Sequence, residues 1–227
     1  MPILNMERRA ILIDCSPTPP PKADRNGTLN AFHDFLCSPS GGSWEQEEIT
    51  LLDQVAIADI QKAVTAAKDS DFTLVLVIAA GVEAKMGRPW PEVRIDAVDG
   101  TLNERELNPG CARCLMIFDC TGSRQSVHAQ VDYSPSKNDT RKKYDEAIRA
   151  AEAGLVKVFA SKAEGGAHLV WSLLAASHDW ATTGSGILHV GDMVARIQQN
   201  RDDSLQSSSV KYIGGRRLKD FPFCIFV

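Results

Sequence analysis

Residues 72–79 read Phe-Thr-Leu-Val-Leu-Val-Ile-Ala, a run of apolar and β-branched side chains that contains no charge. Such a run, apolar on both faces and much shorter than the roughly 20 residues of a membrane span, is typical of a strand inside a covered sheet. Residues 9–15 (RAILIDC) and 114–118 (CLMIF) have a similar apolar centre. Together these three segments favour a parallel sheet that is buried on both faces.

Segments with the spacing of amphipathic helices alternate with these strands. We expect helices at residues 29–36, 57–67, 139–153, 167–177 and 190–199, further strands at 48–52 and 156–160, and a small hairpin at 93–102. We expect loops at the polar residues 124–137 and 200–209, and the apolar residues 221–227 are expected to dock on the body or pair as an edge. Strands that alternate with helices predict right-handed crossovers and helices on both faces, in one α/β domain over residues 1–227.

The composition excludes several classes of protein. With 25 Lys and Arg against 29 Asp and Glu, the net charge of −4 gives no long-range attraction to nucleic acid or to an anionic membrane. The apolar stretch within the first 14 residues is too short and too soon interrupted for a signal peptide. We therefore expect a cytoplasmic protein without a nucleic-acid or membrane partner, whose six cysteines are reduced.

Candidate site residues are sought where the strands end. In open α/β sheets the site lies beyond the carboxyl ends of the strands. Four places meet this rule: Asp14-Cys15, Ala79-Ala80-Gly81, residues 119–123 and Ser161-Lys162. A nucleophile there is well placed when a helix begins beyond it, because backbone N–H groups can stabilise an oxyanion.

Stretches spread over most of the chain resemble bacterial caspase-like domains of the caspase, metacaspase and paracaspase group of cysteine endopeptidases, the peptidase C14 type. The resemblance is carried by RRAILIDCSP (8–17), FLCSPSGGSWEQEEITLL (35–52), DFTLVLVIAAG (71–81), DAVDGTLNERELNP (96–109), CLMIFDCTGS (114–123), VFASKAEGG (158–166), LVWSLL (169–174) and FPF (221–223). It implies a caspase-like three-layer sandwich, with helices on both faces of a mostly parallel sheet of six strands.

The resemblance also implies a catalytic dyad, and this chain departs from it at both positions. In the family, a histidine in a Gly-His-Gly turn after the third strand assists a cysteine in an Asp-x-Cys-x-Ser-Gly type motif after the fourth. Here the turn reads Ala79-Ala80-Gly81, so Ala80 stands at the histidine position. The second motif is DCTGS at 119–123, which puts Thr121 at the nucleophile position, or Cys120 if one residue is deleted.

The missing base argues against efficient proteolysis. General-base assistance is worth roughly 10²–10⁴ in rate, and a free thiol is only a few per cent thiolate at neutral pH. His128 follows Cys120 by eight residues and is the histidine best placed in sequence to replace the base. An engineered substitution at Ala80 would leave Ala79 and Thr121 unexplained.

Two carboxylates are assigned to substrate binding. Asp119 matches the family position that resembles the acidic floor of a pocket for a basic P1 residue, as in metacaspases, and Asp14 is placed with it. The plainer alternative for Asp119 is a carboxylate at a strand end that accepts backbone N–H bonds. A pocket without a dyad would bind a peptide with an Arg or Lys side chain and leave it uncleaved.

The leading hypothesis is therefore a catalytically degenerate pseudo-protease, a regulatory or binding partner of another protein. By analogy with bacterial relatives, that partner is a protease, sensor or effector of a defence (antiviral) or programmed-death pathway. The alternative is an active caspase-type or metacaspase-type cysteine endopeptidase that uses Cys120 and cleaves after basic residues. No cofactor and no metal is predicted.

Other motifs are less specific. Cys111-Ala-Arg-Cys114, with Cys120, suggests a metal or redox site, but a zinc ribbon needs a second pair at matched distance and Cys114 enters an apolar strand. Asp14, Thr121 and Lys162 resemble the strand-end residues of a phospho-acceptor receiver, yet alanine replaces the aspartate that such a domain needs after its third strand.

One cluster of basic residues, Arg141-Lys142-Lys143, opens a charged helix and is predicted to form a solvated face. It follows the loop where caspase-like chains are often cut between their two parts. The resemblance therefore also suggests that a protease with a basic preference processes the chain there.

Overall fold

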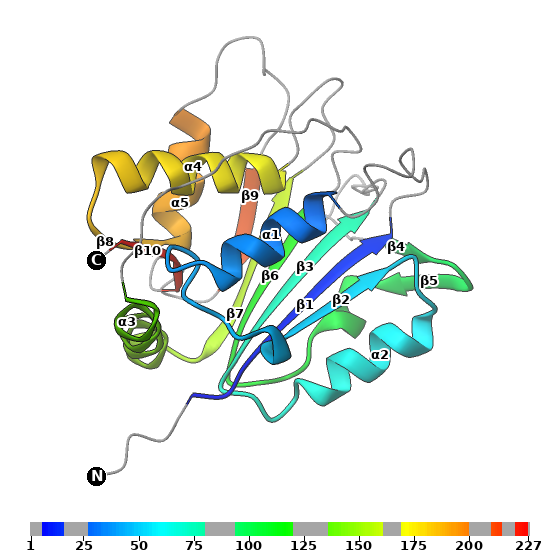
Figure 1. Ribbon diagram of the computed structural model, residues 1–227. Coiled ribbons are helices and arrows are strands. Elements are labelled where there is room, and N and C mark those ends of the chain that lie inside the picture. Colours follow the sequence, from blue (N-terminus) through cyan, green and yellow to red (C-terminus); the bar gives the residue numbers. More distant parts are fainter. Residues whose placement is uncertain are drawn as a thin grey trace.

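A central six-stranded sheet organises the computed structural model, which describes residues 6–15, 27–79, 94–119, 136–160, 169–199, 210–214 and 221–226. The strands lie in the order β2-β1-β3-β6-β7-β9 (Figure 1). Their bounds are β1 Arg8–Cys15, β2 Ile49–Asp53, β3 Phe72–Ala79, β6 Arg113–Asp119, β7 Gly154–Ala160 and β9 Val210–Gly214. The first five pair in parallel, and β9 pairs with β7 in the antiparallel direction. The mostly parallel six-stranded sheet that the caspase resemblance implies is confirmed.

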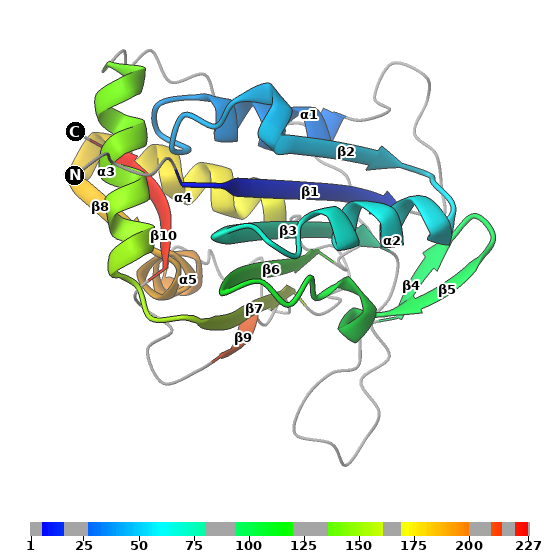
Figure 2. The same ribbon diagram turned by 90° about the horizontal axis from the view of Figure 1, so that it is seen from below.

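Helices cover both faces of this sheet, which completes the three predicted layers (Figure 2). One face packs against α1 (Gly27–Cys37), α3 (Lys137–Ala150), α4 (Leu169–Thr183) and α5 (Val190–Gln199). The other face packs against α2 (Ile57–Ala66), the hairpin of β4 (Arg94–Ala97) and β5 (Gly100–Asn103), and the short helix η2 (Glu104–Leu107). All eight residues of β3 are buried because both faces of this strand are covered.

The structure adds a second small sheet that the sequence did not reveal. β8 (Gly186–His189) pairs in the antiparallel direction with β10 (Pro222–Phe226). The expectation that the apolar residues 221–227 dock on the body or pair is thus confirmed for residues 221–226, which are all buried. A four-residue strand has too few alternations to be seen in sequence, and its partner is more than thirty residues away.

Several helix and loop bounds differ from the predicted ones. The helix expected at 139–153 begins at Lys137 and ends at Ala150, and the one expected at 167–177 continues to Thr183. The predicted loop at 124–137 therefore ends earlier, while residues 124–135 and the predicted loop at 200–209 lie outside the described residues. A short 3₁₀ helix, η1 (Gln46–Glu48), also precedes β2.

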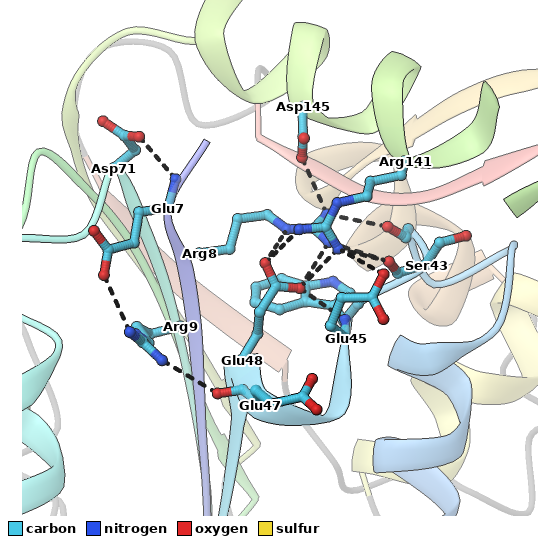
Figure 3. Close-up of polar contacts among 12 residues, drawn as sticks. Glu7, Arg8, Arg9, Ser43, Glu45, Glu47, Glu48, Asp71, Arg141 and Asp145 are labelled. Carbon is cyan, nitrogen blue, oxygen red and sulfur yellow. Dashed lines mark hydrogen bonds and ion pairs between the residues drawn. The ribbon is translucent and has the colours of Figure 1, made fainter. Parts of the chain in front are cut away.

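A buried arginine at the start of β1 joins three segments of the chain (Figure 3). Arg8 is 1% exposed, and its guanidinium bonds to Glu48 Oε2 at 3.0 Å and to the carbonyl oxygens of Gly42 and Ser43 at 3.0 and 3.2 Å. Its Nη1 lies 3.1 Å from Asp145 Oδ1 of α3, an ion pair without hydrogen-bond geometry. The first strand is thereby tied to the loop before η1 and to α3.

Aromatic rings and a second arginine complete this cluster. The guanidinium of Arg8 lies 4.5 Å from the ring centroid of Trp44 and 5.7 Å from that of Tyr144. Arg141 donates to both carboxylate oxygens of Glu48, at 2.6 and 2.9 Å. Arg141 is therefore half-buried and paired, so the predicted solvated face is wrong for it and holds only for Lys142 and Lys143, which are exposed.

We expect Arg8→Ala to lower the free energy of unfolding by about 3–5 kcal/mol, because Asp145 loses its buried cation and the Gly42 carbonyl loses its donor, whereas the Ser43 carbonyl keeps a hydrogen bond from Arg141. Urea denaturation of the full chain measures this. The control is the neighbouring Arg9→Ala, whose side chain is 41% exposed and pairs with Glu7, and which should cost at most about 1 kcal/mol. Equal losses in the two variants would contradict the central role of Arg8.

The cluster also predicts a dependence of stability on pH. Burial raises the pKa of Glu48, but hydrogen bonds from Arg141 and Arg8 outweigh it, so this pKa lies below its usual 4.5. The stability from ionised Glu48 is therefore complete above about pH 4.5 and is lost as pH falls through the lowered folded-state value. The test is to measure the free energy of unfolding from pH 7 to pH 3. Near neutral pH, Glu48→Gln should be less stable than the wild type by about 2 kcal/mol, and this difference should shrink as the pH falls.

Candidate functional site

The candidate site is a row of carboxylates at the carboxyl edge of the sheet. The pairing register places Asp53 beside Asp14, Asp14 beside Ile78, and Ile78 beside Asp119. Residues paired in register on parallel strands point to the same face, and neighbouring strands lie about 4.8 Å apart. Asp14 and Asp119 are therefore two strand spacings apart, about 10 Å, on the face that α1 and α4 cover.

Asp119 ends β6 in a fully buried position. Its side chain is 0% exposed, and Oδ2 accepts a hydrogen bond from the backbone N–H of Val170 at 3.0 Å. Val170 lies in the first turn of α4, where backbone N–H groups have no partner within the helix and the helix dipole favours a negative charge. The plainer of the two roles considered for Asp119, acceptance of a backbone N–H, is present. A role in binding a basic side chain stays a prediction.

Asp14 and the adjacent thiol lie at the end of β1. Asp14 is half-buried, and its carbonyl oxygen accepts from the backbone N–H of Gln54 at 3.0 Å, which ties the ends of β1 and β2 together. Cys15 is buried on the opposite face. Burial, together with the negative charges of Asp14, Asp96 and Asp53, raises the pKa of the Cys15 thiol to about 11. Cys15 is therefore protonated at neutral pH and is a poor nucleophile.

Of the predicted site residues, the structure brings together Asp14 and Asp119, one on each side of Ile78. Ala80, Cys120 and Thr121 lie outside the described residues, as do Ser161 and Lys162, so their predicted roles stay predictions. Ala80 directly follows the last residue of β3 in the chain, and Cys120 directly follows Asp119.

Three histidines, His33, His178 and His189, lie in the described part of the chain. His33 on α1 contacts Asp34 at 3.1 Å and Cys37 at 3.8 Å. His178 follows Val170 by eight residues along α4, about 12 Å at the rise of an α-helix. His189 ends β8 and pairs with Pro222. His128, the predicted substitute base, lies outside the described residues.

Asp53 and Asp96 were missed in the sequence. The predicted strand at 48–52 stopped one residue short of Asp53, which ends β2 and joins the row. The same strand-end rule that selected Asp14 would have found it. Asp96 lies on β4, and its charge acts on Cys15 only because the hairpin folds back on the sheet. Nothing local in the sequence signals that approach.

The described ranges contain no group of three or more His, Cys, Asp or Glu side chains arranged to hold a metal ion. None of their helices combines the length and apolar character needed to cross a membrane.

Comparisons with known proteins found similarity among solved structures. No model of a protein family matches the sequence, and no curated protein sequence matches it. Among solved structures, one described as "pro-sf-caspase-1" is 12% identical with a TM-score of 0.46, covering 92% of this chain and 93% of that chain. A crystal structure of caspase-1 from Spodoptera frugiperda is 11% identical with a TM-score of 0.48, covering 92% and 86%. Nothing about activity, substrate or partners follows from similarity at this level.

The contact between Asp119 and α4 has a measurable consequence. Asp119→Ala should destabilise the chain by about 2 kcal/mol, because the buried N–H of Val170 loses its acceptor. Hydrogen exchange should show weaker protection of the Val170 amide in this variant. Asp119→Asn keeps an acceptor oxygen of the same reach and should retain that protection. Unchanged exchange at Val170 in Asp119→Ala would contradict the assignment.

Proposed function

We propose that this chain is a catalytically degenerate caspase-like protein that binds a basic side chain of another protein without cleaving it. The observation that carries the proposal is the register row in which Asp14 and Asp119 flank Ile78 at the carboxyl edge of the sheet. This edge is where ligands bind in open α/β sheets. Asp14 and Asp119, two strand spacings apart on one face, are placed to provide a negative field for one Arg or Lys side chain.

The lack of catalysis follows from residue chemistry. The residue after β3, where the family resemblance expects a histidine, is Ala80, whose side chain cannot accept a proton. Among the described residues, Cys15 is the thiol at this edge of the sheet, and its pKa of about 11 keeps it protonated. An unassisted thiol supports little acyl transfer, since the thiolate is the nucleophile.

A partner protein follows from the same chemistry. A site that binds a basic side chain and does not turn it over functions by occupancy, so its effect depends on a second protein that carries that side chain. By analogy with the family that the sequence resembles, the partner is a protease, sensor or effector of a bacterial defence or programmed-death pathway. Basic residues next to a scissile bond in such a protein are the expected ligands.

The binding arm of the test uses defined peptides with one Arg or Lys, and matched peptides with Gln at that position. We expect the purified chain to bind the basic peptides and to lose about tenfold in affinity in Asp14→Asn, as one charge–charge contact is removed. Asp59→Asn on the exposed surface of α2 is the matched control and should bind as the wild type does. Equal binding of basic and Gln peptides would overturn the proposal.

The cleavage arm tests the alternative. Fluorogenic peptides with Arg or Lys at P1, with and without calcium, should remain intact while circular dichroism shows a folded protein. Cleavage that is lost in Cys120→Ala would instead establish an active endopeptidase with Cys120 as its nucleophile. In that case His128→Ala would identify the base.

A further inference from the structure

Two cysteines spaced as Cys-x-x-Cys lie at the amino end of β6. This end of β6 is at the edge of the sheet opposite the carboxyl ends of the parallel strands (Figure 1). Cys111 is half-buried in the turn before the strand, and Cys114 is buried on the strand itself. Both pack in the apolar layer beneath α2. The proposed basic-peptide site does not use either residue.

The turn before β6 holds Cys111 close to the strand. Gly110 has a φ of +77°, a conformation that side-chain-bearing residues rarely adopt, and its N–H bonds to Asn108 Oδ1 at 3.0 Å. On the other side, the carbonyl oxygen of Ala112 accepts from the N–H of Gly154 at 2.9 Å, which anchors the segment to β7. Cys111 and Cys114 therefore pack in the same apolar layer, close enough for each thiol to shift the pKa of the other.

A pair of hydroxyl groups lies beside the two sulfurs. Cys114 is in register with Thr73 on β3, and Thr73 Oγ1 lies 2.7 Å from Ser70 Oγ. Ser70 Oγ and Thr73 Oγ1 donate to the carbonyl oxygen of Ala67 at 2.7 and 3.4 Å, and both hydroxyl groups act to lower the pKa of Cys111. The Cys111 thiol itself lies 3.0 Å from the carbonyl oxygen of Arg113. In this arrangement the Cys111 S–H donates to the Arg113 carbonyl, and the nearby Thr73 hydroxyl can stabilise the thiolate once that proton is lost.

These contacts separate the acidities of the two thiols. Hydrogen bonds from Cys114, and then from Thr73, the Arg113 backbone and Ser70, outweigh burial and lower the pKa of Cys111 to about 6. The pKa of Cys114 is raised well above its usual value, first by its hydrogen bond to Cys111 and then by burial. An accessible thiolate next to a protected thiol is the arrangement of a nucleophilic and a resolving cysteine.

We propose that Cys111 and Cys114 form a redox site that exchanges with small or protein disulfides, with Cys111 as the attacking sulfur and Cys114 as the resolving one.

The exchange balances in two steps. The Cys111 thiolate attacks one sulfur of a disulfide R–S–S–R′, forming a mixed disulfide Cys111–S–S–R and releasing R′–S⁻. The Cys114 thiol gives up its proton, which the released R′–S⁻ takes, and attacks the Cys111 sulfur. RS⁻ leaves and takes a proton from water. The site is oxidised to an intramolecular disulfide, and the external disulfide is reduced to two thiols.

The other described cysteines lack this chemistry and supply internal references. Cys37 has His33 Nε2 at 3.8 Å, but burial and then the charge of Asp34 raise its pKa. Burial raises the pKa of the Cys224 thiol to about 12, and the pKa of the Cys15 thiol is about 11. Among the five cysteines in the described residues, Cys111 is the one whose pKa lies below the ordinary value of a thiol.

The first measurement is the alkylation rate of each cysteine in the full chain between pH 5 and 9, followed by peptide mass spectrometry. At pH 6, Cys111 should react about twentyfold faster than a thiol of ordinary pKa, since its larger thiolate fraction outweighs its lower intrinsic nucleophilicity. Its rate should level off above about pH 7. A Cys111 rate that rises with pH in parallel with that of Cys37 would overturn the proposal.

The second measurement incubates the chain with oxidised and reduced glutathione, followed by acid quenching and peptide mapping. The wild type should lose two hydrogens and give a Cys111–Cys114 linked peptide, reversibly with dithiothreitol. Cys114→Ala should stop at the mixed disulfide and retain one glutathionyl group on Cys111, while Cys111→Ala should form neither product. Absence of the linked peptide in the folded wild type under excess oxidised glutathione would refute the redox role.

Thr73→Val is the control for the role of the hydroxyl group. It preserves the shape of a buried side chain and removes one donor to Cys111, so the alkylation profile should shift to higher pH, with a rate at pH 6 about twofold lower. Cys37 serves as the reference within the same sample. An unshifted profile would mean that the hydroxyls do not tune this thiol.

Discussion

The structure depends on the buried guanidinium of Arg8 at the start of the first strand. Its charge is shared by Glu48 before β2, Asp145 on α3 and two backbone carbonyl groups, and its plane lies over Trp44. Such a charge is tolerated inside a protein only when partners surround it. Its partners come from segments up to 137 residues apart, so the cluster forms only when β1, the loop before η1 and α3 have all reached their places.

This anchor lies at the amino edge of the sheet, and the proposed binding site lies at the opposite, carboxyl edge. Because five strands of the sheet run parallel, they all begin at the edge that holds the Arg8 cluster and the paired cysteines, and they all end at the opposite edge. Asp53, Asp14 and Asp119 reach that edge in one register row. The two proposed sites therefore lie at opposite ends of the same strands, and the chemistry of one does not require that of the other.

Most of the architecture was predictable from local patterns, since long apolar runs and amphipathic helices carry strong periodic signals. The strands at 72–79 and the hairpin at 93–102 are close to their predicted bounds. The pairing of β8 with β10 was not predictable from the sequence, because a four-residue strand carries little periodicity. The burial of Arg141 was also missed, because a basic triplet at a helix start looks like a solvated face until Glu48 is brought against it.

The sequence alone determined the order of strands and helices, the residue types at the strand ends, and the substitution of alanine at the position where the family resemblance expects a histidine. Only the tertiary structure decided which of those residues share a face, which is a matter of register between strands. It also decided the acidity of the thiols. The pKa of a cysteine depends on burial and on donors from other strands, so Cys15 and Cys111 differ although their local sequences do not predict it.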